Sequence, residues 1–113
     1  MTLPAISPWE IWDVDLNPQV GSEQANVRPA IVVGSSTMCD VAGRRLALVV
    51  PCTSRDRGLA WQPKIMLREP SVVMCEQLKS LSRLRLVRRW GPGYQVPQGV
   101  REEIRWNLTN LIG

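Results

Sequence analysis

The chain has 113 residues, of which 44% are hydrophobic, which suits one folded domain over residues 1–113 and not two. No apolar run approaches the roughly 20 residues of a membrane span, and Met1–Glu10 lacks the basic and apolar regions of a secretory signal. The formal net charge is +4, and a basic surface attracts polyanions. These features predict a soluble cytoplasmic protein.

The residue types present limit the chemistry. The chain contains no histidine, which excludes a Ser-His-Asp hydrolase and an RNA-cutting pair of histidines. The three cysteines, Cys39, Cys52 and Cys75, are widely spaced and form no Cys-x-x-Cys pair. This spacing disfavours a zinc site and indicates reduced thiols packed as small hydrophobic side chains. We therefore expect neither a metal nor a cofactor.

Short strands are predicted over most of the chain. Trp12, Val14 and Leu16 alternate with Asp13 and Asp15, which predicts a half-buried strand within residues 9–16. A polar loop is expected from Asn17 to Val27. Further strands are predicted at Pro29–Gly34, Leu46–Pro51, Lys64–Leu67, Val72–Cys75 and Arg83–Trp90, the last ending at a Gly-Pro-Gly turn.

The last segment has the periodicity of a helix. Its apolar stripe has offsets of four, four and three residues and consists of Val100, Ile104, Leu108 and Leu111. Pro97 suits the start of this helix. Trp106 lies off the stripe, where we expect partial burial at the helix edge, with a partner contact as the alternative. Short strands followed by one helix predict a mainly β protein with a small curled or barrel-like sheet.

Four motifs in order point to one family. They are Glu10–Pro18 (EIWDVDLNP) followed by Gly21-Ser22-Glu23-Gln24, then Arg28–Val33 (RPAIVV), Val49–Ser54 (VVPCTS) and Cys75–Leu81 (CEQLKSL). In this order and spacing the chain resembles the MazF/PemK (Kid) family of bacterial toxins over nearly its whole length.

The resemblance implies a fold, an activity and partners. It implies an SH3-like barrel that forms a homodimer, and a sequence-specific endoribonuclease that cleaves single-stranded RNA, mainly mRNA, without a metal. It also implies an acidic cognate antitoxin. The chain departs from the family at Met74, where some members have arginine, at Glu76, where the acid is usually aspartate, and in a short 67–71 segment. These departures concern the RNA contacts of the Cys-Glu-Gln segment, which is expected to be a strand.

Metal-free RNA cleavage uses the 2′-hydroxyl of the RNA as the nucleophile. Arg28, at a loop–strand junction, is the expected stabiliser of charge on the phosphate, because its guanidinium is always charged and forks onto two oxygens. Thr53 is the expected hydroxyl donor. Glu23 in the preceding loop is the first candidate for the general base, and Glu76 is the second. The alternatives are a surface ion pair for Arg28 and a turn-capping role for Thr53.

Several neighbours are expected to bind RNA. They are Gln24, Ser54, Arg55, Arg57, Glu76 and Gln77. The alternating Arg83, Arg85, Arg88 and Arg89 are instead predicted to form the solvent face of a strand. Base stacking would fall mainly to Trp9, Trp12, Trp61, Trp90 or Trp106, since Tyr94 is the only tyrosine and phenylalanine is absent.

Two other functions remain open from the residues alone. A gyrase poison of the CcdB type shares this fold without being an enzyme, and fold does not fix function. An SH3-like binding module is the other, although its aromatic groove is not evident from tryptophans scattered along the chain.

Overall fold

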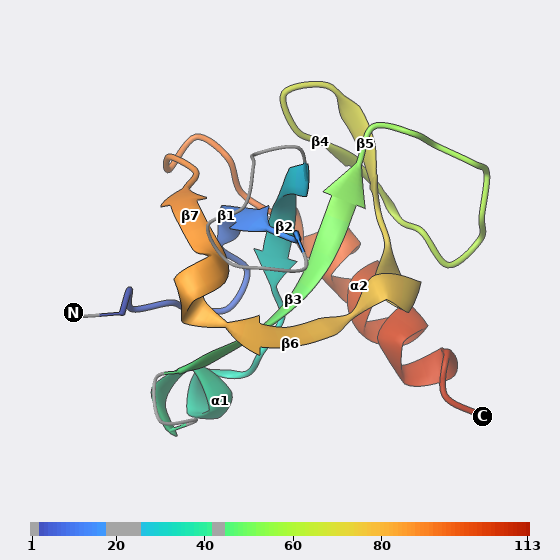
Figure 1. The fold of residues 1–113 in the computed structure, drawn as a ribbon. Coiled ribbons are helices and arrows are strands. Elements are labelled where there is room, and N and C mark those ends of the chain that lie inside the picture. The colour runs from blue at the N-terminus through green and yellow to red at the C-terminus, as the bar shows by residue number, and fades with distance from the viewer. Residues whose placement is uncertain (1–2, 18–25, 42–44) are drawn as a thin grey trace.

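The computed structural model describes residues 3–17, 26–41 and 45–113, and the described residues form a strongly curled antiparallel sheet with two α-helices (Figure 1). The strands are β1 (Ile11–Asp15), β2 (Val27–Val32), β3 (Leu46–Thr53), β4 (Lys64–Met66), β5 (Pro70–Val73), β6 (Lys79–Ser82) and β7 (Leu86–Arg89). The helices are α1 (Ser36–Val41) and α2 (Gln98–Asn110). The mainly β class with a C-terminal helix is therefore confirmed.

Strand β3 is the centre of the sheet. The strand order is β4-β5-β3-β2-β1-β7, and β6 also pairs with β3. The first half of β3 pairs with β6 from Leu46 to Val49, and its last two residues, Cys52 and Thr53, pair with β5. One long strand thus changes partners along its length, which curls the sheet. In Figure 1, α1 and the β4–β5 hairpin lie at opposite ends of β3.

Both faces of the sheet are buried. One hydrophobic cluster joins Ile11, Ile31 and Val50 to Ile104 of α2, and Val100 and Leu108 pack against it. The other cluster contains Trp12, Val14, Ala30 and Val49, with Cys39 of α1 and partly buried Leu16. The predicted face of Trp12, Val14 and Leu16 is confirmed, but β1 is not half-buried, because Ile11 faces a second core.

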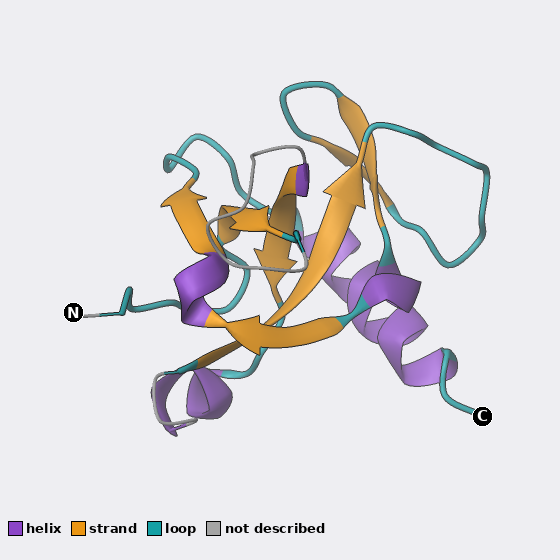
Figure 2. Ribbon diagram, viewed as in Figure 1, coloured by secondary structure: helices purple, strands orange, loops and turns teal. Residues whose placement is uncertain are grey.

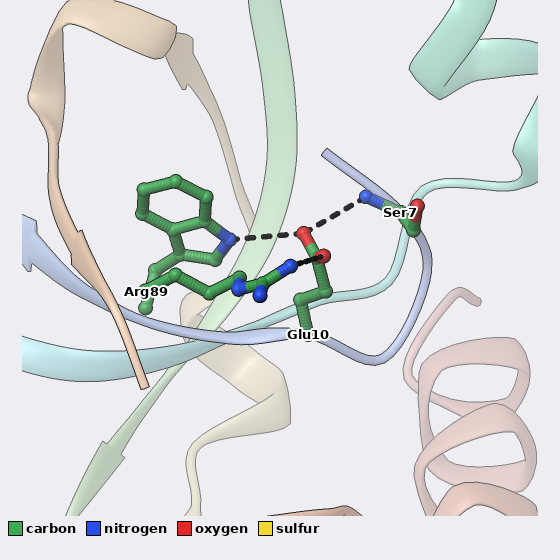
Figure 3. Close-up of polar contacts among 4 residues, drawn as sticks. Ser7, Glu10 and Arg89 are labelled. Carbon is green, nitrogen blue, oxygen red and sulfur yellow. Dashed lines mark hydrogen bonds and ion pairs between the residues drawn. The ribbon is translucent and has the colours of Figure 1, made fainter. Parts of the chain in front are cut away.

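The segment before β1 is tied to the sheet by one carboxylate. Glu10 accepts hydrogen bonds from the Ser7 backbone N–H at 2.9 Å and from Trp12 Nε1 at 3.1 Å. Arg89 of β7 donates to its other oxygen at 3.1 Å, so three segments meet at this side chain (Figure 3). The motif residue Glu10 thus has a structural role here.

The strand predicted at Arg83–Trp90 is wrong in its first half. Residues Arg83–Arg85 form a short 3-10 helix, η3, and only Leu86–Arg89 pairs with β1. Arg83 is 1% exposed, so it does not belong to a solvent face. Arg88 and Arg89 are exposed, as predicted.

Helix α1 was not predicted, because six residues are too few to show a clear helical period. The strand expected over Cys75–Leu81 is present only in its second half, as β6. The Cys-Glu-Gln segment forms a 3-10 helix, η2 (Cys75–Gln77), between β5 and β6. Its Gln77 and Leu78 N–H groups donate back to Met74 and Cys75 carbonyls, which removes them from any strand ladder.

Helix α2 begins where the sequence predicts and packs by its apolar stripe. Ile104 is fully buried, and Val100 and Leu108 are partly buried, whereas Leu111 is 42% exposed. Trp106 is 66% exposed, so the expected partial burial is wrong and a partner contact remains open. Within the described residues, no helix has the length and apolarity to cross a membrane.

Candidate active site

A cleft opens where strands β2 and β3 stop pairing. The last pair of their ladder is Ala30 with Pro51. Proline has no backbone N–H, so Pro51 and Pro29 give the ladder no donors at this point. Beyond it, β3 turns to pair with β5, and the parting strands leave a solvent-open cleft of about 230 Å³, lined by Pro29, Cys52, Thr53 and Ser54.

Thr53 presents its hydroxyl in this cleft. The side chain is partly buried, and its Oγ1 accepts a hydrogen bond from the Arg55 backbone N–H at 3.2 Å. Thr53 therefore has the turn-capping role considered as the alternative, but this role does not exclude a part in catalysis. The hydroxyl accepts in the turn and still has its own hydrogen to donate to a phosphate oxygen.

Arg28 lies on the exposed edge of β2, one residue before Pro29 of the cleft lining. Its Nε–H donates to Asn26 Oδ1 at 3.0 Å. Asn26 in turn donates through Nδ2 to the Leu16 carbonyl at 3.2 Å, across the base of the β1–β2 loop. The guanidinium is thus aimed by Nε, while the two terminal nitrogens keep the fork that binds phosphate. The ion pair considered for Arg28 is not among those of the described residues.

The sequence did not indicate that Asn26 holds Arg28, and this hydrogen bond predicts a measurable effect. We expect Asn26→Ala to lower the cleavage rate by about three- to tenfold, the equivalent of one net hydrogen bond. A matched control is Asn110→Ala on α2, which also loses one side-chain bond, to the Trp106 carbonyl. Rates on one RNA oligonucleotide give the comparison, and equal rates for the two variants would contradict the tether.

Of the two candidate general bases, the structure describes Glu76 and not Glu23. Glu23 and its neighbour Gln24 lie outside the described residues, so both assignments stay predictions. Glu76 accepts two hydrogen bonds from Gln62 Nε2, at 2.8 and 3.1 Å, and does not line the cleft. This anchored carboxylate is a poor candidate for the base. Gln77 is also exposed outside the cleft.

The remaining predicted contacts lie around the cleft. Ser54 is exposed and lines it, directly beside Thr53. Arg55 and Arg57 are exposed on the long loop between β3 and β4, drawn as loop in Figure 2. They follow the cleft in sequence without lining it. Their placement suits contacts to flanking phosphates and stays a prediction.

The β4–β5 turn and the start of β5 supply cleft residues that the sequence reasoning missed. They are Leu67, Arg68, Glu69 and Ser71, together with Trp90 after β7. Glu69 is the carboxylate that the described part of the chain brings to this cleft. Trp12 and Trp90 are 7% and 5% exposed, so neither ring has a free face for base stacking, whereas Trp61 and Trp106 are exposed.

The cysteines are structural, as predicted. All three are free and buried. Burial, together with the smaller effect of the neighbouring Cys75, raises the pKa of the Cys52 thiol to about 12. Burial, with the negative charge of Glu76, raises the pKa of Cys75 to about 12 as well. Although Cys52 borders the cleft, its thiol is protonated at neutral pH and is not a nucleophile.

Comparison with known proteins identifies relatives over most of the chain. The endoribonuclease toxin MazF of Escherichia coli K12 is 36% identical over 73 residues, which cover 64% of this chain and 63% of MazF, just under two thirds of that relative. Endoribonuclease PemK of Escherichia coli is 31% identical over 110 residues, covering 91% of this chain and 79% of PemK.

Structural comparison gives the same relationship. The crystal structure of MazF from Deinococcus radiodurans superposes with a TM-score of 0.73 at 28% identity, covering 100% of this chain and 99% of that one. The family model described as "PemK-like, MazF-like toxin of type II toxin-antitoxin system" matches residues 7–112. The chain therefore belongs to the PemK-like, MazF-like family of type II toxins.

Proposed function

We propose that this protein is the toxin of a type II toxin–antitoxin pair and acts as a metal-independent, sequence-specific endoribonuclease on single-stranded RNA, mainly mRNA. The observation that supports this proposal most directly is the cleft at the end of the β2–β3 ladder, which Thr53 lines. Arg28 lies on the adjoining strand β2, where Asn26 accepts a hydrogen bond from its Nε–H. Family membership and relatives that are themselves named endoribonucleases support it.

The reaction that these residues serve is an internal transesterification. The 2′-oxygen of the RNA attacks the adjacent phosphorus, the bond to the 5′-oxygen breaks, and the products carry a 2′,3′-cyclic phosphate and a 5′-hydroxyl. The extra negative charge develops on the non-bridging oxygens. Arg28 can fork onto two of these oxygens, and Thr53 can donate to one. Glu23 is proposed to take the 2′-hydroxyl proton.

The substrate chemistry gives the decisive test. We expect cleavage of a single-stranded RNA to persist in excess EDTA and to stop when the nucleotide before the cut carries 2′-deoxyribose, because the nucleophile is then missing. Product termini are read by mass spectrometry. Activity lost on chelation and restored by Mg²⁺ would contradict the mechanism. Absence of RNA cleavage, with toxicity retained, would favour the gyrase-poison alternative instead.

The proposal includes the partners. The basic cleft surroundings, Arg28, Arg55 and Arg57, suit an acidic antitoxin segment whose carboxylates take the place of phosphates. The proposal also includes self-association as a homodimer and a cytoplasmic location. Trp106, which is 66% exposed, is an apolar side chain available for contact with a second copy of the chain or with the antitoxin.

A further inference from the structure

Arg68 is held on the face of an aromatic ring at the cleft. Its Cζ atom lies 3.9 Å from the centroid of the Trp90 ring and 5.9 Å from that of Tyr94. The two rings pack edge to face, with centroids 4.7 Å apart. Trp90 is buried, and its Nε1–H donates to Asp13 Oδ1 at 2.7 Å. The ring beneath the guanidinium is therefore itself fixed to β1.

A tight turn fixes the backbone of Arg68 as well. Met66 pairs with Pro70, and between them the Leu67 N–H donates to the Glu69 carbonyl at 3.2 Å. Leu67 is buried in the core, which anchors the turn. The short 67–71 segment, the departure from the family pattern, thus carries a guanidinium at its tip beside Thr53 and Ser54.

Within the described part of the chain, the N–H groups of the Arg68 guanidinium have no hydrogen-bond partner. Stacking occupies the face of a guanidinium and leaves its N–H groups at the edge. The ion pairs of the described residues are Arg88–Asp13 and Arg89–Glu10, and neither includes Arg68. Glu69 lines the same cleft, and its backbone carbonyl accepts hydrogen bonds from the Ser71 hydroxyl at 3.0 Å and from the Leu67 N–H. Its carboxylate has no hydrogen-bond partner among the described residues. A charged, oriented fork beside hydroxyl groups is a site for a phosphate.

Building on the proposed function, we propose that Arg68, braced by Trp90, binds a backbone phosphate of the RNA next to the phosphate that Thr53 contacts. Arg68 is then a substrate-positioning group that sets which strand path crosses the cleft, and Asp13 and Trp90 hold it in place. The Glu69 carboxylate beside it opposes binding of a second phosphate at the same spot. The subsite therefore accepts one phosphate at a defined distance from the cut.

Binding of a 2′-deoxy-blocked RNA separates this role from a structural one. We expect Arg68→Gln to weaken binding about tenfold or more and to lower the slope of log affinity against log salt by about 0.7, the share of one phosphate contact on a single strand. Arg45→Gln removes the same charge from an exposed residue directly before β3, at the end of the strand opposite Thr53, and serves as the matched control. We expect Glu69→Gln to tighten binding.

A scan with neutral methylphosphonates locates the phosphate. One linkage, adjacent to the scissile one, is expected to weaken wild-type binding when neutralised and to have no effect in Arg68→Gln. Equal sensitivity of both proteins at every linkage overturns the proposal, and so does loss of Arg68-dependent affinity on removal of a base instead of a phosphate charge. Wild-type cleavage of the unblocked RNA is scored separately, so failure of the proposed function is distinguishable.

Discussion

Arg28→Ala is expected to lower the RNA cleavage rate by about 100-fold or more, by analogy with the loss of one preorganised oxyanion donor. The physical reason is position: Arg28 Nε–H donates to Asn26 Oδ1, and the terminal nitrogens, which have no partner among the described residues, are left for the phosphate. Folding should persist, because the side chain is exposed and contributes nothing to either core. The measurement is a single-turnover rate on one RNA, with far-UV circular dichroism to verify the fold.

Conservative variants sharpen this experiment. Arg28→Lys keeps the charge but loses the fork and the Nε bond, so we expect an intermediate rate. Thr53→Ala should lower the cleavage rate less than Arg28→Ala does. Thr53→Ser keeps the hydroxyl and should retain most of the cleavage activity. Arg45→Ala removes an exposed arginine far from the cleft and should leave the rate unchanged. An Arg28→Ala protein that cleaves at the wild-type rate would show that the charge is stabilised by another group.

The sequence predicted the parts of the fold that depend on local pattern. Alternating apolar residues located β1, and a four-four-three spacing located α2, because both periods are properties of one segment. The family motifs identified Arg28 and Thr53 as candidate site residues, and the structure explains why a cleft opens between their strands. Pro29 and Pro51, 22 residues apart, end one ladder together, and no local pattern shows that pairing.

What sequence reasoning missed depends on groups distant in the chain. The role proposed for Arg68 depends on Trp90, 22 residues later in the chain, because the ring contact exists only after β7 has paired with β1. Arg83 looked like one member of an exposed arginine run. Its burial is set by three backbone carbonyls from three separate segments, and a pattern of residue types does not reveal where carbonyls converge.

Arg83 has the largest expected effect on stability. Its Nε donates to the Leu46 carbonyl at 2.9 Å, its Nη1 to the Pro4 carbonyl at 3.3 Å, and its Nη2 to the Cys39 carbonyl. The side chain thus joins the N-terminal segment, α1 and the first residue of β3. Removing it leaves three acceptors without this donor and a cavity in a fully enclosed site.

We therefore expect Arg83→Ala to lower the free energy of unfolding by about 3–5 kcal/mol, a large part of the about 5–15 kcal/mol typical of a domain. The urea midpoint measures this at a constant m-value. Arg88→Ala is the matched control: Arg88 is exposed and 3.5 Å from Asp13, and such a surface pair contributes about 0–1 kcal/mol. Because Arg83 holds the start of the strand that ends in Thr53, its loss should also reduce cleavage, but only in proportion to the unfolded fraction. A midpoint equal to that of Arg88→Ala would show that the three carbonyls find other donors, and a rate loss in fully folded protein would assign Arg83 a role in the cleft itself.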